Sequence, residues 1–464
     1  MITLIRYFNY FILFYLLFVN LVYTAFFIVS IGSIYISNKK DKYWSYKDMI
    51  ELSYTPPLSI LVPCYNEDET IVDNVKALLS LEYGEFEIVI INDGSKDNTL
   101  KTLKEAFNLQ SIDIPYRKQV DTKEVKGIYV SNQVENIIVI DKKNGGKADA
   151  LNAGINVCQY PLFTAIDADS LIEQDALLKV VRPFIENPSV VVSGGTVRPV
   201  NGSVVDQGFI EEIRLPKNNL ARFQVVEYLR AFLFGRMGWS AINALMIVSG
   251  AFGVFNKKVA VDAGGYTSDT IGEDMELIVK IHRIMKEQRK KYKVAFIPDP
   301  VCWTQVPEDK ATLKNQRKRW HKGLIDTVIN HKNLIFNPQY GVVGLLAIPY
   351  YVLIEMLGPI VEIIGYIFIP FSLIYGVINL RFALYFFALA VGYGIFLSIG
   401  AILLDEYSYK KYEKISEYLI LVLYSILENL GYRQLSTWWR FIAIFEYKRK
   451  NNKWGDMNRK KFNN

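Results

Sequence analysis

Short acidic motifs end several apolar runs of this sequence, a position from which carboxylates can hold cations or accept protons. They are Asn92-Asp93-Gly94-Ser95, Asp167-Ala168-Asp169 and Gly272-Glu273-Asp274. Carboxylate oxygens are the ligands that Mg²⁺ and Mn²⁺ prefer, and a carboxylate can also act as a general base. Alone, each motif is equally typical of a polar turn or of an acidic first turn of a helix. Their recurrence at the ends of apolar runs favours a shared site.

Two further motifs add positive charge and an aromatic ring. In Gly145-Gly146-Lys147, a lysine opens a segment of helical pattern, where its ammonium and free backbone N–H groups suit a phosphate ligand. A solvated lysine at a helix end is the alternative. Farther along, Arg319 can pair with a diphosphate and Trp320 can stack on a sugar ring. The alternative for Trp320 is an anchor at a membrane surface.

Between about residues 56 and 333, short β-rich runs alternate with helical segments. Strands are predicted at 58–62, 86–91, 136–140 and 163–166, and helices at 68–81 and from about 99. This alternation predicts an α/β fold with a Rossmann-like parallel sheet covered on both faces. Ligands of such sheets bind at the carboxyl ends of the strands. Residues 63–67, 92–97 and 167–169 all fall at such ends.

Long apolar segments flank this region. Residues 7–36 carry no charge and can cross a bilayer of ~30 Å, so they predict a membrane anchor rather than a removed signal peptide. Residues 341–380 contain three prolines and predict a broken interfacial or re-entrant helix followed by a span. Residues 382–404 predict a clean span, and 417–447 a helical hairpin or a span plus an interface helix. We expect four crossings after the α/β region, with two as the alternative.

Two carboxylates fall within the broken element. Glu355 and Glu362 are seven residues apart, which places them on one face of a helix. At membrane depth they should face protein or water rather than lipid. They line a polar conduit or form a pair at headgroup level, and the sequence favours neither.

Composition and charge agree with a membrane protein. Of the 464 residues, 51% are hydrophobic and 14% aromatic, more than a soluble domain requires. The net charge is only +6, but Lys and Arg cluster at 39–42 and 448–461, which places both flanks on the cytoplasmic side. No nucleic-acid motif accompanies these clusters, so we expect no nucleic-acid partner. Three scattered cysteines without metal spacing indicate a reduced cytoplasmic domain.

In their order, the motifs resemble those of the processive family 2 glycosyltransferases, the membrane synthases of cellulose, mixed-linkage glucan, hyaluronan, chitin and poly-N-acetylglucosamine. The resemblance covers nearly the whole chain. Asn92 departs from the first Asp of many members, and Gly272 from the Thr of cellulose synthases. The motifs that carry the resemblance are Pro63-x-Tyr65-Asn66-Glu67, Asp93-Gly94-Ser95, Gly145-Gly146-Lys147-Ala148 with Leu151-Asn152, Asp167-x-Asp169, Glu273-Asp274 and Gln316-x-x-Arg319-Trp320.

The resemblance implies a role for each motif. Asp169 would bind Mg²⁺ or Mn²⁺, with Asp167 beside it on the metal or the donor ribose. Asp274 would be the catalytic base, with Glu273 as its competitor. Trp454-Gly455 would be a gating element, or else part of a disordered tail. The other implied contacts are Tyr65, Glu67 and Asp93 on the uridine, Lys147, Gln316 and Arg319 around the diphosphate, and Ser249, Gly250 and Trp320 at the acceptor sugar.

The implied activity is processive, inverting synthesis of a β-linked polysaccharide from a UDP-sugar, with export through the protein's own membrane segments. Segments 248–255 and 272–277 look closest to bacterial synthases of β-glucan or poly-N-acetylglucosamine. We expect UDP-glucose and a β-glucan, with mixed β-1,3/β-1,4 linkage as one form. A poly-N-acetylglucosamine or hyaluronan type of polymer is the alternative. Transfer to a lipid acceptor and a non-catalytic scaffold that binds nucleotide sugars are further alternatives.

These expectations divide the chain into four parts: a transmembrane helix at 1–40, a cytoplasmic catalytic domain at 41–333, interface and channel helices at 334–447, and a basic cytoplasmic tail at 448–464. The N-terminus is expected outside the plasma membrane. The expected partners are the UDP-sugar, the growing glycan, the lipid bilayer, and accessory export or regulatory proteins.

Overall fold

The computed structural model describes residues 2–41, 55–113, 115–167, 170–206 and 208–448, which form two compact units. The α/β unit holds the described residues of 39–214 and 243–305, and the helical unit those of 2–38, 215–242 and 306–448. Residues 215–242 and 306–333, which we expected in the catalytic domain, group with the helices. Asp169 and Trp454-Gly455 lie outside the described residues.

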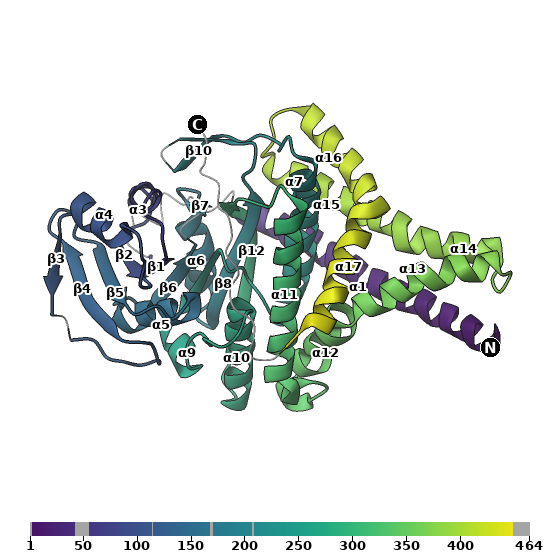
Figure 1. Ribbon diagram of the computed structural model, residues 1–464, viewed down its shortest axis with the longest axis horizontal. Helices are drawn as coiled ribbons and strands as arrows, with labels where there is room; N and C mark the ends of the chain where they lie inside the picture. The colour runs from purple at the N-terminus through teal and green to yellow at the C-terminus, as the bar shows by residue number, and fades with distance from the viewer. Residues whose placement is uncertain (1, 42–54, 114, 168–169, 207, 449–464) are drawn as a thin grey trace. The chain divides into compact units, whose positions relative to one another are not determined.

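The α/β unit is built on a ten-stranded sheet in the order β3-β4-β5-β2-β1-β6-β11-β8-β12-β7 (Figure 1). Its strands are β1 (Leu58–Cys64), β2 (Phe86–Asn92), β3 (Leu109–Ile112), β4 (Val125–Ser131), β5 (Ile137–Lys142), β6 (Leu162–Ile166), β7 (Leu171–Ile172), β8 (Val190–Pro199), β11 (Phe252–Asn256) and β12 (Lys293–Thr304). A separate antiparallel pair joins β9 (Val204–Asp206) to β10 (Phe209–Glu212).

The centre of the sheet confirms the predicted Rossmann-like core, because β5, β2, β1 and β6 are parallel neighbours. β2 is buried throughout, which explains its unbroken apolar sequence. The sheet as a whole is mixed, and of the described strands outside this core only β8 and β12 pair in parallel. β4 and β11 run antiparallel to both of their neighbours. Parallel neighbours need a crossover of a dozen or more residues, and the short link from β4 to β5 cannot supply one.

Helices of the α/β unit lie between the strands in sequence, as predicted. They are α3 (Ile71–Leu79), α4 (Thr99–Ala106), α5 (Lys147–Val157), α6 (Ala176–Glu186), α9 (Lys257–Asp262) and α10 (Glu273–Glu287). α3 buries Ile71, Val75 and Leu78, the spacing of a one-sided apolar face. α5 is buried almost along its whole length after Lys147. It is therefore a core helix whose N-terminus is fixed by packing.

The helical unit consists of α-helices joined through π-helical and 3₁₀ turns. Its α-helices are α1 (Ile2–Asp41), α7 (Asn219–Arg230), α8 (Met237–Ala241), α11 (Lys310–Asn330), α12 (Ile348–Tyr350), α13 (Gly358–Ile374), α14 (Leu380–Phe387), α15 (Tyr393–Tyr409), α16 (Ile415–Leu427) and α17 (Arg433–Glu446). The intervening turns are η1 (Ala231–Arg236), η2 (Lys332–Leu334), η3 (Pro338–Tyr340), η4 (Val343–Ala347), η5 (Tyr351–Met356), η6 (Ala388–Gly392) and η7 (Glu428–Tyr432).

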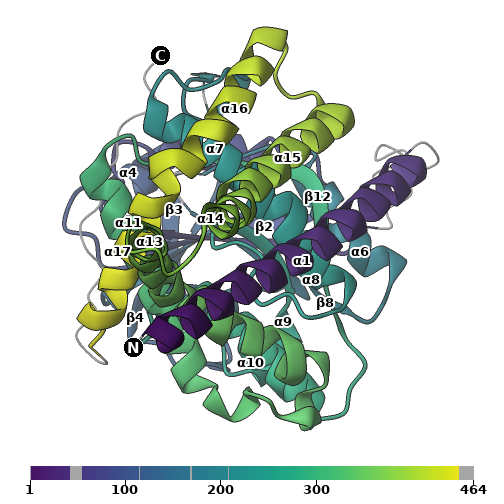
Figure 2. The same ribbon diagram turned by 90° about the vertical axis from the view of Figure 1, so that its right-hand side faces the viewer.

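Two helices of the described residues are long and apolar enough to cross a membrane, namely Ile5–Lys39 and Leu380–Tyr409. The first is the long purple α1 of Figure 2. Val343–Met356 and Gly358–Ile374 add a third span if this pair, bent by 41°, counts as one. The bend is the break that the prolines predicted.

The expectation of four crossings after the α/β region is not met, because the described residues offer at most two there. The physical reason lies between α16 and α17. Leu430 and Gly431 have non-helical backbone angles, and the charges of Glu428 and Arg433 flank them. Neither helix is therefore long and apolar enough by itself, and the lower alternative of two agrees with the structure.

Charged side chains within the helical unit are paired. Arg440 binds Glu355 through Nη2 at 3.0 Å, and Arg230 binds Glu428. Glu362 accepts hydrogen bonds from Tyr366 at 3.2 Å and Thr437 at 3.1 Å. Glu355 and Glu362 thus face protein, as expected at membrane depth. They do not share one straight helix face, because the 41° bend separates them.

Candidate active site

Loops after the neighbouring strands β1 and β2 are tied together at the carboxyl end of the sheet. The backbone N–H of Asn66 donates to Ser95 Oγ at 3.0 Å, and the N–H of Glu67 donates to Thr99 Oγ1 at 2.9 Å. Asp93 joins the same group through its N–H, which donates to the carbonyl of Cys64 at 3.0 Å. Tyr65, between these contacts, is exposed. The structure thus brings together Tyr65, Glu67 and Asp93, as their strand-end positions predicted.

Asp93 is buried and holds the glycine turn that starts α5. Its Oδ1 accepts from Gly145 N at 2.9 Å, and its Oδ2 accepts from Gly146 N at 2.7 Å. Gly146 has φ of +87°, a conformation that favours glycine. The carboxylate therefore sets the position of Lys147, the first residue of α5.

Lys142 is a site residue that the sequence analysis missed. It ends β5, is fully buried, and places Nζ 2.6 Å from both Asp93 Oδ1 and Asp149 Oδ2. Asp149 also accepts from Lys123 N at 2.9 Å. Buried charges persist when they are paired and hydrogen-bonded. A lysine at the end of the all-apolar run 137–140 was the available signal, since burial there requires carboxylate partners.

We predict that Lys142→Met lowers the free energy of unfolding by about 3–5 kcal/mol, because it leaves two buried carboxylates without their cation. Chemical unfolding of the detergent-purified protein measures the change. Lys143→Met is the matched control. Its partner is Glu124, and both side chains are more than 60% exposed, so the loss should stay below about 1 kcal/mol. Equal losses in the two variants would show that the buried charge group does not stabilise the fold.

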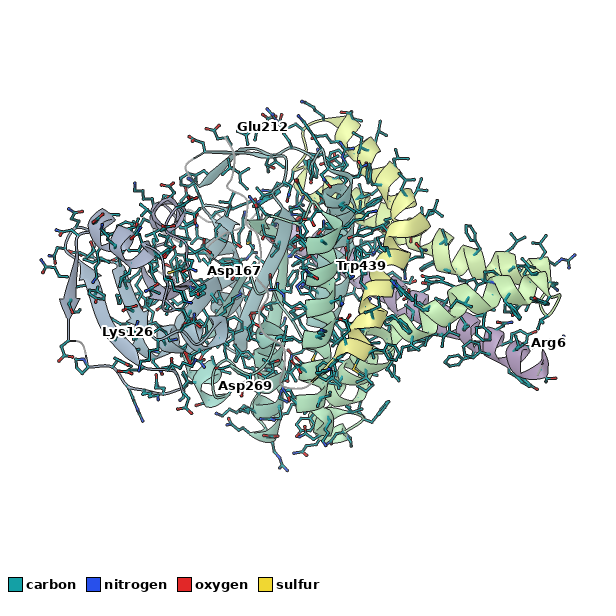
Figure 3. All side chains as sticks on the ribbon, viewed as in Figure 1. Arg6, Lys126, Asp167, Glu212, Asp269 and Trp439 are labelled. Carbon is teal, nitrogen blue, oxygen red and sulfur yellow. The ribbon has the colours of Figure 1, made fainter. Side chains whose placement is uncertain are left out.

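A second charge group surrounds the ammonium of Lys147. Nζ lies 2.7 Å from Asp167 Oδ1 and 3.9 Å from Glu273 Oε1, and it donates to the carbonyl of Gly250 at 3.3 Å. Asp167 follows β6, and Glu273 starts α10. Two of the three acidic motifs that the sequence singled out therefore meet around one lysine. Figure 3 labels Asp167 in this part of the α/β unit.

Asp274 completes this group from the first turn of α10. A Cβ built on Gly250 would lie only 1.9 Å from Asp274 Oδ2. Position 250 therefore has no room for a side chain while Asp274 keeps its place. Beside it, Ser249 Oγ accepts from Ala251 N at 3.2 Å. The predicted floor of small residues thus lies directly against the predicted base.

Burial and mutual repulsion shift the pKa values of this group. Burial lowers the pKa of Lys147, but Asp167, Asp274 and Glu273 together raise it above its ordinary value. Burial, followed by the charge of Asp274, raises the pKa of Glu273 to about 7. Glu273 is 4% exposed, whereas Asp274 is only partly buried. The pKa favours Glu273 as a base near neutral pH, and access favours Asp274.

We predict that Glu273→Gln stabilises the protein at about pH 8 but not at about pH 5. Because its pKa is raised, Glu273 of the folded protein keeps its proton at pH values where the unfolded chain, with the ordinary pKa of 4.5, has released it. Wild-type stability therefore falls as pH rises from that value through about 7, by up to ~3 kcal/mol. The neutral amide avoids this loss. Thermal unfolding at both pH values is the measurement, and exposed Glu105→Gln is the control. A gain that does not depend on pH would contradict the assignment.

The structure describes only one of the two residues that we expected to bind a divalent cation. Among the described residues, no group of three or more His, Cys, Asp or Glu side chains could hold a metal ion. Asp167 nevertheless offers carboxylate oxygens, and one of them already binds the Lys147 ammonium as a stand-in cation. This donor chemistry fits Mg²⁺ or Mn²⁺. Asp169, the other expected ligand, lies outside the described residues.

The Gln316-x-x-Arg319-Trp320 motif lies on α11 of the helical unit. Trp320 is 44% exposed, and Gln316 Oε1 is buried with no hydrogen-bond partner among the described residues. Arg317, which the sequence analysis did not single out, stacks 4.6 Å from the Trp320 ring and binds Glu227 at 2.7 Å. Arg317 of the same helix thus orients the Trp320 ring, which stays partly exposed.

Comparison with known proteins establishes the family. Residues 162–399, more than half of the chain, match the model for glycosyl transferase family group 2, and residues 59–239 match that for glycosyl transferase family 2. The chain therefore belongs to the family 2 glycosyltransferases. This confirms the family that the motif order resembled.

Its relatives are named as synthases. The chain is 31% identical over 315 residues to a poly-β-1,6-N-acetyl-D-glucosamine synthase of Staphylococcus epidermidis, covering 68% of this chain and 64% of the relative. A protein of the same name from Staphylococcus aureus (strain COL) is 30% identical over 321 residues, with 68% and 65% covered. The chain thus spans just under two thirds of the length of these curated relatives.

A solved structure shares the fold. A mannosyltransferase from Pyrobaculum calidifontis, in complex with GDP-Man and Mn²⁺, superposes with a TM-score of 0.50 over 89% of this chain and 99% of its own. The identity is 17%, so this likeness concerns the fold alone. It agrees with the α/β class predicted from the alternation of strands and helices.

Proposed function

We propose that this protein is a membrane-bound, inverting glycosyltransferase that polymerises a β-linked polysaccharide from a UDP-sugar. The observation that carries the proposal is the meeting of Asp167, Glu273, Asp274 and Lys147 at the carboxyl end of the sheet. Ligands of open α/β sheets bind at this end. Family membership supports sugar transfer, and helices of membrane-spanning length support action at a bilayer.

We further propose UDP-N-acetylglucosamine as the donor and a poly-N-acetylglucosamine as the product. The printed names of the relatives support this choice over UDP-glucose. The β-glucan expected from segments 248–255 and 272–277 becomes the alternative. The motifs of the site are shared by synthases of both products, so our choice between them rests on the names of the relatives.

The proposed reaction displaces UDP with inversion at the anomeric carbon. An acceptor hydroxyl attacks this carbon, its proton passes to Asp274, and the bond to the diphosphate breaks with its electron pair leaving on UDP. Asp274 is preferred to Glu273 because it is the less buried of the two. Gly250 allows this carboxylate to lie directly against the backbone of the loop before β11.

Negative charge on the leaving group would be balanced by the positive groups of the same site. Lys147 and the free N–H groups at the start of α5 are suited to the diphosphate. Asp167, with Asp169, would hold Mg²⁺ or Mn²⁺, which neutralises developing charge on the leaving oxygens. Tyr65 and Glu67 line the proposed uridine pocket. Asp93 supports that pocket by holding the glycine turn, since its carboxylate already accepts several hydrogen bonds.

The helical unit supports an additional role in moving the product. Tyr15, Glu362, Tyr366 and Arg433 contribute hydroxyl and charged groups to one small pocket among its helices, whose other lining residues are apolar. Hydroxyl and charged groups of this kind suit a glycan more than a lipid tail. We propose that Gln316, Arg319 and Trp320 form the entry of such a conduit, with Trp320 as the platform for the acceptor sugar.

We place the protein in the plasma membrane with its α/β unit in the cytoplasm, where UDP-sugars are available. The lysines at 39–42 and the basic tail support this orientation. The growing glycan and the bilayer are its proposed partners, together with accessory export or regulatory proteins.

The decisive experiment supplies purified protein with Mg²⁺ and radiolabelled UDP-N-acetylglucosamine or UDP-glucose. We predict high-mass product from the first donor, and near-complete loss with Asp274→Asn, because losing a general base costs ~10²–10⁴ in rate. UDP binding should be unchanged in this variant. Linkage-specific hydrolases identify the polymer.

Other outcomes would change the proposal in defined ways. Polymer from UDP-glucose alone would restore the β-glucan. A lipid-linked monosaccharide would replace polymerisation with single transfer. If Glu273→Gln abolishes turnover while Asp274→Asn does not, the roles of the two acids are reversed. Absence of any product in the presence of normal UDP binding would favour a scaffold.

We predict that Trp320→Ala abolishes long product while UDP binding stays close to normal, because stacking on an indole contributes on the order of a few kcal/mol to holding the chain end. Product length by gel filtration and UDP affinity by calorimetry are the measurements. Trp438→Ala is the matched control, since Trp438 is 46% exposed on α17. Full-length glycan from Trp320→Ala would show that this residue is only an interfacial anchor.

A further inference from the structure

Three separate segments hold the ammonium of Lys147. Asp167 lies at the end of β6, Glu273 at the start of α10, and Gly250 in the loop before β11. The shortest contact, 2.7 Å, is to Asp167 Oδ1, whose side chain is 33% exposed, whereas that of Lys147 is 13% exposed. The ion pair therefore sits at the border of the protein interior, with its carboxylate open to solvent and its ammonium turned inward.

Negative charge exceeds positive charge around this lysine. Asp167, Asp274 and Glu273 all raise the pKa of Lys147, so one ammonium faces three acidic groups, of which Glu273 keeps its proton up to about pH 7 because its own pKa is raised. If the ammonium left without replacement, these acids would repel one another in a partly buried space. A cation at this position therefore relieves the repulsion, and Lys147 supplies it in the described structure.

A divalent ion at Asp167 and this ammonium would compete for the same carboxylate. Lys147 Nζ lies 2.7 Å from Asp167 Oδ1, so a metal bound through this carboxylate would bring two positive charges close together, and they would repel each other. A nucleoside diphosphate removes the conflict. It brings negative charge for both cations, and its oxygens give the lysine a new partner in front of the N-terminus of α5.

We propose that Lys147 is a built-in counter-ion that occupies the cation position at Asp167 until metal and diphosphate arrive together. The inference rests on the proposed function and adds a regulatory property to the same site. Divalent metal alone binds weakly because it must displace the ammonium. Metal with diphosphate binds well because the ammonium moves to the phosphate. The protein thereby avoids holding metal without donor.

Helix α5 makes such an exchange mechanically simple. Asp93 and Lys142 fix the turn before Lys147, and burial fixes the helix after it. Only the lysine side chain then has to move, by rotation about its own flexible bonds. The neighbouring Gly146 has open space where a Cβ would stand, so no side chain of residue 146 lies beside Lys147.

The test measures binding of Mn²⁺ to the full chain in detergent by electron paramagnetic resonance, with and without UDP. In wild type we expect weak binding of Mn²⁺ alone and at least about tenfold tighter binding with UDP, equivalent to ~1.4 kcal/mol of coupling. Lys147→Met should bind Mn²⁺ alone about tenfold more tightly than wild type. In this variant UDP should add little.

Controls separate direct exchange from a general effect of charge. Lys143→Met removes the same charge four residues away, from an exposed pair with Glu124, and should match wild type. Lys147→Arg keeps the charge and should also match wild type for Mn²⁺ alone. Thermal unfolding checks that each variant is folded, and Lys147→Gln replaces Lys147→Met if the latter is not.

The outcomes for the inference and for the proposed function are distinct. If Lys147→Met binds Mn²⁺ alone no more tightly than Lys143→Met, while wild type binds Mn²⁺ with UDP, the counter-ion role is wrong and the proposed function stands. If wild type binds Mn²⁺ neither alone nor with UDP, metal-dependent transfer fails, and the inference fails with it.

Discussion

The arrangement of the α/β unit around its candidate site depends on one buried charge group, the ammonium of Lys142 between Asp93 and Asp149. Asp93 directly follows β2, Lys142 ends β5, and Asp149 lies in the first turn of α5. Because buried charges must be balanced locally, these three segments cannot separate without a large loss of free energy. Asp93 also holds the glycine turn, so this charge group also fixes the position of Lys147 at the start of α5.

Much of this architecture follows from the sequence. The runs at 58–62, 86–91, 136–140 and 163–166 identify the parallel core because strands buried on both faces must be apolar throughout. The positions of Tyr65 and Asp93 after neighbouring strands are then enough to predict that their loops lie close together. The directions of β4 and β11 could not be read in this way, since they depend on connection lengths and on the path of the chain through the helical unit.

The acidic residues of the candidate site could be predicted from the sequence, but the buried lysine that supports the site could not. Asp167, Glu273 and Asp274 stand out as motifs, but Lys142 looks like any solvated lysine after a strand until its burial is known. The prediction of four membrane crossings was wrong for a related reason. Apolar content from 417 to 447 suggests membrane helices, whereas the backbone break at Leu430 and Gly431 is a local conformation that composition does not encode.

The contact between Gly250 and Asp274 constrains the two residues unequally. With Asp274 in place, a Cβ at position 250 would lie only 1.9 Å from Oδ2, so any residue larger than glycine must turn the carboxylate aside. Replacing Asp274 by a side chain of equal or smaller size meets no such obstacle. The glycine is therefore required only for as long as the carboxylate keeps its present orientation.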